Sequence, residues 1–473
     1  MAHEPRDHER AGGAGRKAQI TPAPETIAAI ATPPGRGGVG IVRVSGTDIE
    51  ALVRAIAGDV PEPRRATYAT FRDAHGAPLD AGLALYFPAP HSYTGESVLE
   101  LHAHGSPTAL RLLLARTLEL GARVAQPGEF TRRAFLNGKL DLAQAESVAD
   151  LIEAATATAA RAAARSLTGE FSTEVHAIVA ELTDLRMYTE AALDFPEEDI
   201  EFVRAADAAA RLAALRARVT ALLLRARAGV RLNEGLAVVL VGRPNVGKSS
   251  LLNRLVRDAA AIVTDVPGTT RDTVERPIEI GGIPLTVIDT AGLRDTTDPI
   301  ERIGIERTWS AVERADLALV LVDAREAGDA LHAEDRAILA RLPAALPRVI
   351  VHNKSDLAQL AARVEQRDTG VHVWLSALTA AGVPELEAQV LAIAGVDAAA
   401  EGSFIARERH LAALREADAS LASAAAHLAA AQPPLELFAE DLRAAQHGLA
   451  SITGEFTADD LLGVIFSRFC IGK

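Results

Sequence analysis

The sequence contains a single cysteine, Cys470, in 473 residues. One cysteine excludes an intrachain disulfide and a zinc site built on several thiolates, and it fits a reducing compartment. No uncharged apolar run reaches the roughly 18 residues that a membrane-spanning helix requires. The segment before residue 25 is charged and contains glycine but no apolar core, so it is not a secretory signal. Together these absences predict a cytoplasmic protein without a membrane anchor.

The chain also has fewer basic than acidic residues. It contains 49 Lys and Arg residues and 63 Asp and Glu residues, which give a net charge of −14. Such a chain is not built for bulk electrostatic capture of nucleic acid, although a local basic patch could still contact RNA. The hydrophobic share of 49% and the charged share of 24% exclude wholesale disorder. At roughly 150 residues per domain, the length predicts about three domains.

Local composition predicts the outer domains. Residues 1–24 are polar and without periodicity, which predicts a disordered tail. Residues 25–140 mix alternating, strand-like runs with a helical run, which predicts an α+β domain. Residues 141–235 and 396–473 are rich in Ala, Leu, Glu and Arg, which favours helices; Pro196 should interrupt the first of these segments.

Residues 236–395 have a different pattern, in which apolar strands alternate with helical stretches. This alternation is typical of a parallel α/β sheet. The expected strands are Leu236–Val241, Leu285–Thr290, Leu317–Asp323, Arg348–Asn353 and Val371–Ala377. We therefore expect an α/β domain inserted into one all-helical domain that is built from two halves of the sequence.

The first of these strands runs directly into Gly242–Ser249, which fits the phosphate-binding pattern G-x-x-x-x-G-K-[ST] and precedes a helix-forming run. In this context the backbone N–H groups and the helix N-terminus face the phosphates. Lys248 should reach the β- and γ-phosphates, and Ser249 offers a hydroxyl to Mg²⁺.

Four further elements follow in the order that a GTP site requires. Asp289–Gly292 can hold Mg²⁺ through water and meet the γ-phosphate, and the segment before it offers a second Mg²⁺ hydroxyl, Thr270. Asn353–Asp356 places a carboxylate that can accept two hydrogen bonds from guanine, and Ser376–Ala377 closes the base pocket. This segment resembles the GTP-binding domain of the Ras-like superfamily. The predicted GTP-binding residues are Asn245, Val246, Gly247, Lys248, Ser249, Ser250, Thr264, Asp265, Val266, Pro267, Gly268, Thr269, Thr270, Asp289, Thr290, Ala291, Gly292, Asn353, Lys354, Asp356, Ser376 and Ala377.

One position departs from the common pattern of such enzymes. Leu293 stands where many carry a glutamine that orients the attacking water, and no arginine finger can be assigned. Hydrolysis therefore needs another source of positive charge. The side-chain carbonyl of Asn245 could bind a monovalent cation; the alternative is that Asn245 only stabilises its loop.

Several stretches resemble one family in particular: Thr32–Gly46, Pro127–Glu146, Gly242–Asn253 and the terminal Phe469–Lys473, together with the sequences DFPEED and IVTDVPGTTRD. They are similar to the MnmE family, also called TrmE, of tRNA-modifying GTPases, from about residue 25 to the end. The resemblance implies an N-terminal domain like that of tetrahydrofolate-binding aminomethyltransferases, a helical domain and an inserted G domain. It also implies a homodimer whose G domains pair across the dimer when GTP and K⁺ are bound, which activates hydrolysis.

The resemblance further implies a reaction. With an FAD-dependent partner, MnmG (GidA), with which it forms a heterotetramer, the family adds an aminomethyl or carboxymethylaminomethyl group at C5 of the wobble uridine of certain tRNAs. A folate, 5-formyl- or methylene-tetrahydrofolate, supplies the one-carbon unit. By the same resemblance the K⁺ ligands are Asn245, Thr264, Val266 and Thr269, the Mg²⁺ ligands are Ser249 and Thr270, the water-orienting acid is Glu301, and the folate contacts are Arg43, Glu100, Lys139 and Lys473.

Cys470 lies beside the folate-contacting terminus, which suggests a role in the modification chemistry and leaves nucleophile, proton donor and structural roles open. A prenylation signal does not fit Gly472 and Lys473. His102 and His104 share one strand face but lack a third metal ligand, and the glycine pattern at Gly35–Gly40 continues as a strand, so it is not a dinucleotide motif. Two other functions stay open: a ribosome-assembly GTPase switch, and a folate-dependent transferase with a regulatory G domain and no tRNA substrate.

Overall fold

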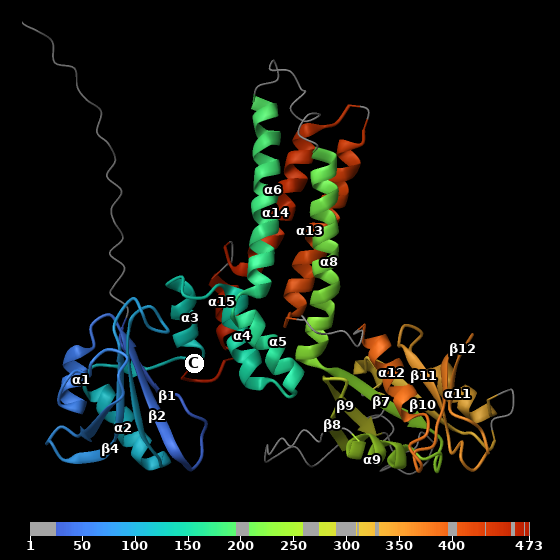
Figure 1. Cartoon of the computed structure of the whole chain (residues 1–473), viewed down its shortest axis with the longest axis horizontal. Coiled ribbons are helices and arrows are strands. Elements are labelled where there is room, and N and C mark those ends of the chain that lie inside the picture. The colour runs from blue at the N-terminus through green and yellow to red at the C-terminus, as the bar shows by residue number, and fades with distance from the viewer. Residues whose placement is uncertain are drawn as a thin grey trace, which may run out of the picture. The chain divides into compact units, whose positions relative to one another are not determined.

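The computed structural model describes residues 25–194, 208–258, 274–289, 309, 312–326, 331–395, 404–430, 432–455, 459–467 and 469–472. The predicted tail at 1–24 and the predicted helix break at Pro196 lie outside these residues. The described chain divides into two compact units. One contains residues 25–139 together with the C-terminal residues from Phe466 onward, and the other contains residues 140–465 (Figure 1).

The first unit is a six-stranded sheet with helices, as an α+β domain requires. The strand order is β3-β4-β5-β2-β1-β6, and every neighbouring pair is antiparallel except β1 with β6. The elements are β1 (Ile27–Ile30), β2 (Gly37–Gly46), α1 (Glu50–Ala57), β3 (Thr67–Arg72), β4 (Pro78–Phe87), β5 (Ser97–Gly105), α2 (Pro107–Glu119), β6 (Arg123–Val124) and α3 (Glu129–Leu136).

Alternation along β2 and β5 gives this sheet two different faces. Val42 and Val44 of β2 and Leu101 of β5 are fully buried in the core with α1 and α2. Arg43 and Glu100, which lie opposite each other in the ladder, therefore point to the other face. Gly37 and Gly40 lie within β2 itself, so the glycine pattern there does not open a helix.

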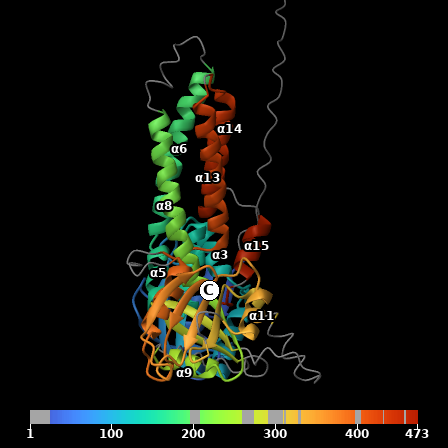
Figure 2. The ribbon, with the colours of Figure 1, turned by 90° about the vertical axis from the view of Figure 1, so that its right-hand side faces the viewer.

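The second unit contains the helical domain, whose two sequence halves pack together as expected. The first half supplies α4 (Leu142–Glu153), α5 (Ala157–Leu167), α6 (Glu170–Asp194) and α8 (Ala208–Glu234). The second supplies α13 (Glu408–Leu428), α14 (Leu435–Thr453) and α15 (Asp459–Ser467). Leucines such as Leu182, Leu222, Leu414 and Leu449 from both halves share one core, and α6, α8, α13 and α14 lie side by side (Figure 2). None of the described helices is long and apolar enough to cross a membrane.

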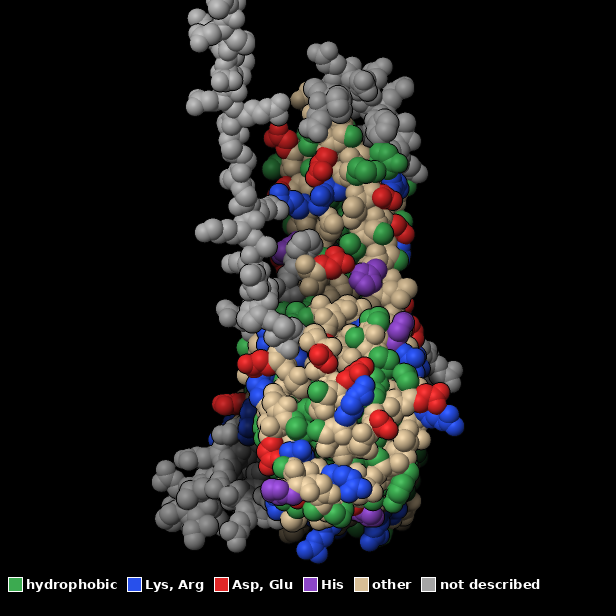
Figure 3. All heavy atoms as spheres, turned by 90° about the vertical axis from the view of Figure 1, so that its left-hand side faces the viewer, with side chains coloured by type: hydrophobic (Ala, Val, Ile, Leu, Met, Phe, Trp, Pro, Cys, Tyr) green, Lys and Arg blue, Asp and Glu red, His purple; other side chains and the backbone are tan. Residues whose placement is uncertain are grey.

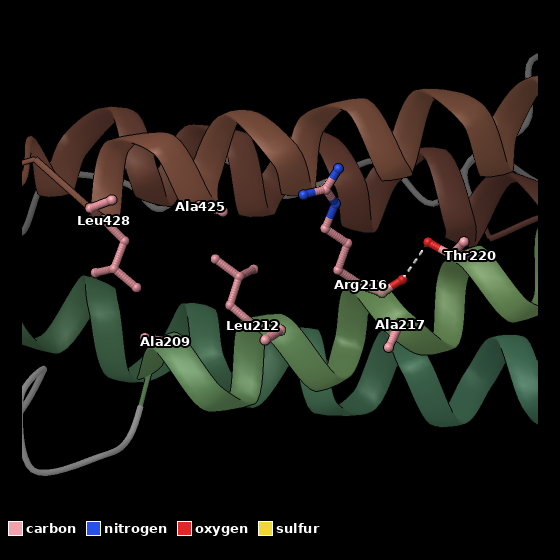
Figure 4. A pocket seen from close by; sticks show the side chains of 9 residues that line it. Ala209, Leu212, Arg216, Ala217, Thr220, Ala425 and Leu428 are labelled. Atoms are coloured by element: carbon pink, nitrogen blue, oxygen red, sulfur yellow. Dashed lines mark hydrogen bonds between the residues drawn. The ribbon is translucent and has the colours of Figure 1, made fainter.

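Packing in the bundle leaves a groove of about 470 Å³ between the beginning of α8 and the end of α13. Leu212 and Leu428 point into it from opposite sides, and small alanines line most of the rest (Figure 4). Arg216 and Thr220 place polar atoms at one end, where both approach Asp418.

The inserted segment forms a seven-stranded sheet in the order β12-β13-β11-β10-β7-β9-β8. Its elements are β7 (Leu236–Gly242), α9 (Lys248–Asp258), β8 (Val274–Ile280), β9 (Ile283–Asp289), β10 (Leu317–Asp323), α11 (Ala333–Arg341), β11 (Arg348–Asn353), β12 (Arg363–Arg367), β13 (Gly370–Trp374) and α12 (Val383–Ala394). The five expected strands are present and parallel.

Both edges of this sheet differ from the expected parallel pattern, because β8 and β12 pair antiparallel with their neighbours. Each edge strand belongs to a hairpin. Gly281 and Gly282 form the β8–β9 turn with φ values of 58° and 88°, which favour glycine. Short hairpins of this kind carry no helix, so the alternation of strands and helices does not indicate them.

Candidate functional site

The phosphate loop connects β7 to α9 at the carboxyl edge of the parallel sheet, where ligands bind in such folds. Gly247 has a φ of 99°, and a Cβ added there would overlap the side-chain amide of Asn353. The loop therefore requires glycine at this position for two independent reasons. Helix α9 begins at Lys248, so its first N–H groups and the positive end of its dipole face the loop.

The side chain of Lys248 folds back over the phosphate loop. Its Nζ donates hydrogen bonds to the carbonyl oxygens of Gly242, at 2.7 Å, and Arg243, at 3.1 Å. Ser249 and Ser250 lie in the first turn of α9 and are exposed. A serine hydroxyl at this position suits an oxygen-preferring cation such as Mg²⁺, so the residue present fits the predicted role.

Asn353 connects two loops of the site to the end of β11. Its Nδ2 donates to the carbonyl of Val246 in the phosphate loop at 2.9 Å, and its Oδ1 accepts from the N–H of Ala377 at 3.1 Å. The side chain is buried, with only 2% of the residue exposed. Because both of its polar atoms are satisfied, Asn353 fixes the phosphate loop and the loop after β13 relative to each other.

Lys354 provides a second connection. Its Nζ donates to the carbonyl of Asn245 at 2.6 Å and forms an ion pair with Asp323 at 2.7 Å. Hydrogen bonds from Arg325 and then Lys354 hold the pKa of the Asp323 carboxyl well below its usual range. Sequence reasoning missed Asp323, although a carboxylate at the end of an apolar strand was the available signal. Asn245 itself is exposed and adopts a φ of 62°.

The two predicted base-recognition segments meet at the ends of β11 and β13. The N–H of Ser355 donates to the carbonyl of Leu375 at 3.1 Å, and Ser376 is fully buried. Asp356 follows on the same turn and is half-buried. This geometry brings Asp356, Ser376 and Ala377 to one side of the phosphate loop, where a nucleotide base would extend from bound phosphates.

A stack of side chains supports these strand ends from one face of the sheet. The centre of the His352 ring lies 4.2 Å from that of the Trp374 ring, and the two rings are inclined by 1°. The guanidinium carbon of Arg363 lies 3.8 Å from the centre of the Trp374 ring. His352 Nε2 hydrogen-bonds His372 Nδ1 at 2.8 Å. Burial lowers the pKa of His352 to about 3 and that of His372 to about 4, so both are neutral at pH 7.

The remaining predicted GTP-site residues lie outside the residues that the structure describes, except for the backbone of Asp289. The backbone of Asp289 ends β9, paired with Leu240 of β7, so the structure places its position but not its side chain. Outside the described residues are Thr264, Asp265, Val266, Pro267, Gly268, Thr269, Thr270, Thr290, Ala291, Gly292 and the predicted water-orienting acid Glu301.

A second polar site lies in the first unit on the outer face of β2 and β5. Arg43 and Glu100 form an ion pair at 2.8 Å, and the guanidinium of Arg43 lies over the rings of Tyr93 and Phe130. Arg43 also donates to the carbonyl of Gly472 at 3.3 Å. Two of the four predicted folate contacts therefore touch each other, and one of them, Arg43, also touches the C-terminal segment.

The C-terminal segment is anchored by backbone contacts. Gly472 has a φ of 98°, and an added Cβ would lie 2.5 Å from the carbonyl oxygen of Ile30. The carbonyl of Cys470 accepts from the N–H of Gly128 at 3.4 Å, and the residue is exposed. Sequence reasoning missed this role of Gly472. The predicted contact Lys139 donates to the carbonyl of Pro90 at 3.1 Å, and Lys473 lies outside the described residues.

The two histidines of β5 pair with separate carboxylates. His102 Nε2 lies 3.2 Å from Glu100, and His104 Nδ1 lies 2.8 Å from Asp80. Within the described ranges, no group of three or more His, Cys, Asp or Glu side chains is arranged to hold a metal ion. On the face drawn in Figure 3, acidic and basic side chains of the described residues are interspersed.

Comparison with known proteins gives consistent matches. Residues 26–139 match the family model for the GTP-binding protein TrmE N-terminus, and residues 142–470 match that for the MnmE helical domain. The tRNA modification GTPase MnmE of Nitrosomonas europaea is 58% identical over 95% of this chain and 99% of its own length. That of Chromobacterium violaceum is 60% identical over 95% and 99%. Among solved structures, a variant of Era from Aquifex aeolicus bound to GDP and AlF4⁻ is 24% identical over 39% of this chain and 66% of its own, at a TM-score of 0.26.

We predict that Gly247→Ala abolishes tight GDP binding. The left-handed backbone costs about 1–2 kcal/mol with a side chain, and the overlap with Asn353 costs about 1–3 kcal/mol more. The Kd measured by isothermal titration calorimetry should therefore rise at least about thirtyfold. Gly395→Ala is the control, because Gly395 also has a positive φ but no atom within 4 Å of an added Cβ. Equal GDP affinity in both variants would contradict this account of the loop.

Proposed function

Because the chain belongs to the MnmE family of tRNA modification GTPases, we propose that it couples GTP hydrolysis to modification of the wobble uridine of certain tRNAs. That it is a GTP hydrolase involved in tRNA modification follows from the family. The observation that supports a nucleotide site is the Asn353 connection, which joins the predicted phosphate loop and the loop after β13 to the end of β11. Asp356 would accept hydrogen bonds from guanine, and Lys248 would contact the phosphates.

Hydrolysis in this site requires a substitute for the missing glutamine and arginine finger. Ser249 and Thr270 would hold Mg²⁺, and Asn245, Thr264, Val266 and Thr269 would hold K⁺. When bound, these cations supply positive charge at the phosphate oxygens as negative charge develops there. Asn245 is suited to this role because Lys354 fixes its backbone while the residue itself stays exposed. Glu301 would orient the attacking water.

The folate donor would bind on the outer face of the N-terminal sheet. Arginine and lysine suit the carboxylates of a reduced folate, and a glutamate can accept hydrogen bonds from the pterin ring. Arg43 and Glu100 meet these requirements as a pair beside Gly472, and Lys139 and Lys473 would complete the site. Cys470 is exposed and lies two residues before Gly472, whose carbonyl Arg43 contacts, and we propose that it takes part in the modification chemistry.

Two assembly steps belong to the same proposal. The chain would form a homodimer, with hydrolysis activated when the G domains of the two copies pair. It would form a heterotetramer with an FAD-dependent MnmG (GidA) partner, which contributes the redox chemistry of the flavin. We place the protein in the cytoplasm, where tRNA and folate are available.

We expect GTP turnover to depend on the alkali ion. Because an arginine finger is worth about 10³–10⁵ in rate where one is present, turnover in K⁺ should exceed turnover in Na⁺ at least tenfold at equal ionic strength. Asn245→Gly should remove this difference, since glycine accepts the positive φ of 62° but lacks the side-chain carbonyl. The measurement is phosphate release at saturating GTP. Equal wild-type rates in the two salts would end the K⁺ proposal.

We expect Glu100→Gln to weaken binding of 5-formyl-tetrahydrofolate. The substitution removes the charge that orients Arg43, and a hydrogen bond to a charged group is worth about 1.5–3 kcal/mol, so the Kd should rise roughly tenfold or more. His104→Ala is the control, because it breaks the other histidine–carboxylate pair of the same strand, that of His104 with Asp80. Fluorescence titration with 5-formyl-tetrahydrofolate measures the Kd of both variants. An unchanged Kd for Glu100→Gln would exclude Glu100 from the folate site.

A further inference from the structure

Arg254 of helix α9 is not among the predicted site residues, but it makes two hydrogen bonds to the loop after β13. Its Nε donates to the carbonyl of Ala377 at 3.0 Å, and its Nη2 donates to the carbonyl of Leu378 at 2.6 Å. Both acceptors lie in the loop after β13, more than 120 residues further along the chain. Arg254 thus connects the helix that follows the phosphate loop to the loop that closes the base pocket.

The loop from Ser376 to Ala381 is closed on itself but projects from the sheet. Within it, Ser376 N–H donates to the carbonyl of Ala381 at 2.8 Å, and Ala380 N–H donates to that of Ser376 at 2.9 Å. Leu378 is 76% exposed, so burial of its side chain does not hold the tip of the loop in place. Ala377 and Ala380 of the loop pack against the core of the sheet, and polar contacts to neighbouring elements position the backbone around Leu378.

Ala377 is held from both sides. Its N–H is bound by Asn353 at the end of β11, and its carbonyl is bound by Arg254 on α9. The guanidinium donates from two nitrogens in a fixed planar fork, and charge-assisted hydrogen bonds are about twice as strong as neutral ones. A lysine could reach one of the two carbonyls but could not reproduce both directions.

We propose that Arg254 is a positioning residue for guanine recognition, which holds residues 376–378 against α9 so that the base pocket keeps the shape that selects guanine. The inference rests on the proposed GTP site, and it concerns the base end of the nucleotide. Arg254 does not contact the predicted phosphate-binding side chains through these bonds. Its loss should therefore affect base selectivity rather than the chemical step.

The test compares wild type with Arg254→Ala, Arg254→Lys and Arg257→Ala, using calorimetric titration with GDP and with ADP, and steady-state GTP hydrolysis. Arg257→Ala is the control, because it removes an exposed arginine from the same helix. For Arg254→Ala we expect the Kd for GDP to rise about tenfold, which corresponds to about 1.4 kcal/mol, while the Kd for ADP is unchanged. The KM of Arg254→Ala for GTP should rise, and its kcat should stay within twofold of the wild-type value. The Kd of Arg254→Lys for GDP should lie between those of wild type and Arg254→Ala. Arg257→Ala should match wild type in every one of these measurements.

Several results would overturn the proposal. Equal loss of GDP and ADP affinity would place the effect at the phosphates, and an unchanged GDP affinity would show that the two bonds do not position the loop. If Arg254→Ala does not fold, the same selective loss, reduced to about threefold, is required of Arg254→Lys, and its absence counts against the inference. A wild-type protein without preference for GDP over ADP would instead contradict the proposed GTP site.

Discussion

The nucleotide site depends on one buried side chain, Asn353. Its amide satisfies a carbonyl of the phosphate loop and an N–H of the loop after β13, so two segments more than 100 residues apart are fixed to the end of β11. Leaving either group unpaired in the interior would cost about 1–3 kcal/mol. The contact also explains why residue 247 is glycine, since the amide occupies the space that a Cβ would need. This contact therefore couples the backbone of the predicted phosphate loop to the predicted base-recognition segments.

The N-terminal site has a different origin, which is the alternation of an antiparallel sheet. From Gly40 to Val44 of β2 and from Leu99 to Gly105 of β5, buried residues alternate with more exposed ones, and the more exposed ones form the outer face. The ladder register then places Arg43 opposite Glu100 without any help from a loop. The C-terminal segment reaches this face because Gly472 approaches the backbone of Ile30 more closely than a residue with a side chain could.

Much of this arrangement could be predicted from the sequence, and the exceptions have physical reasons. Apolar runs that alternate with helical stretches indicate the five parallel strands, and an Ala-, Leu-, Glu- and Arg-rich composition indicates the two-part helical domain. The structure confirms both. The hairpin strands β8 and β12 were missed because antiparallel edges require no helix between them. Asp323 and Arg254 were missed because their partners lie in distant segments, and no local pattern indicates an ion pair or a carbonyl contact formed across the fold.

In the proposed function, this GTPase modifies tRNA through chemistry at the N-terminal face and at Cys470. The most direct measurement is mass spectrometry of the wobble uridine in tRNA from a strain that lacks the protein. The account predicts that the modified uridine is lost, that the wild-type chain restores it, and that Cys470→Ser does not restore it although its GTP turnover is normal. Unaltered tRNA in the deletion strain would contradict the account.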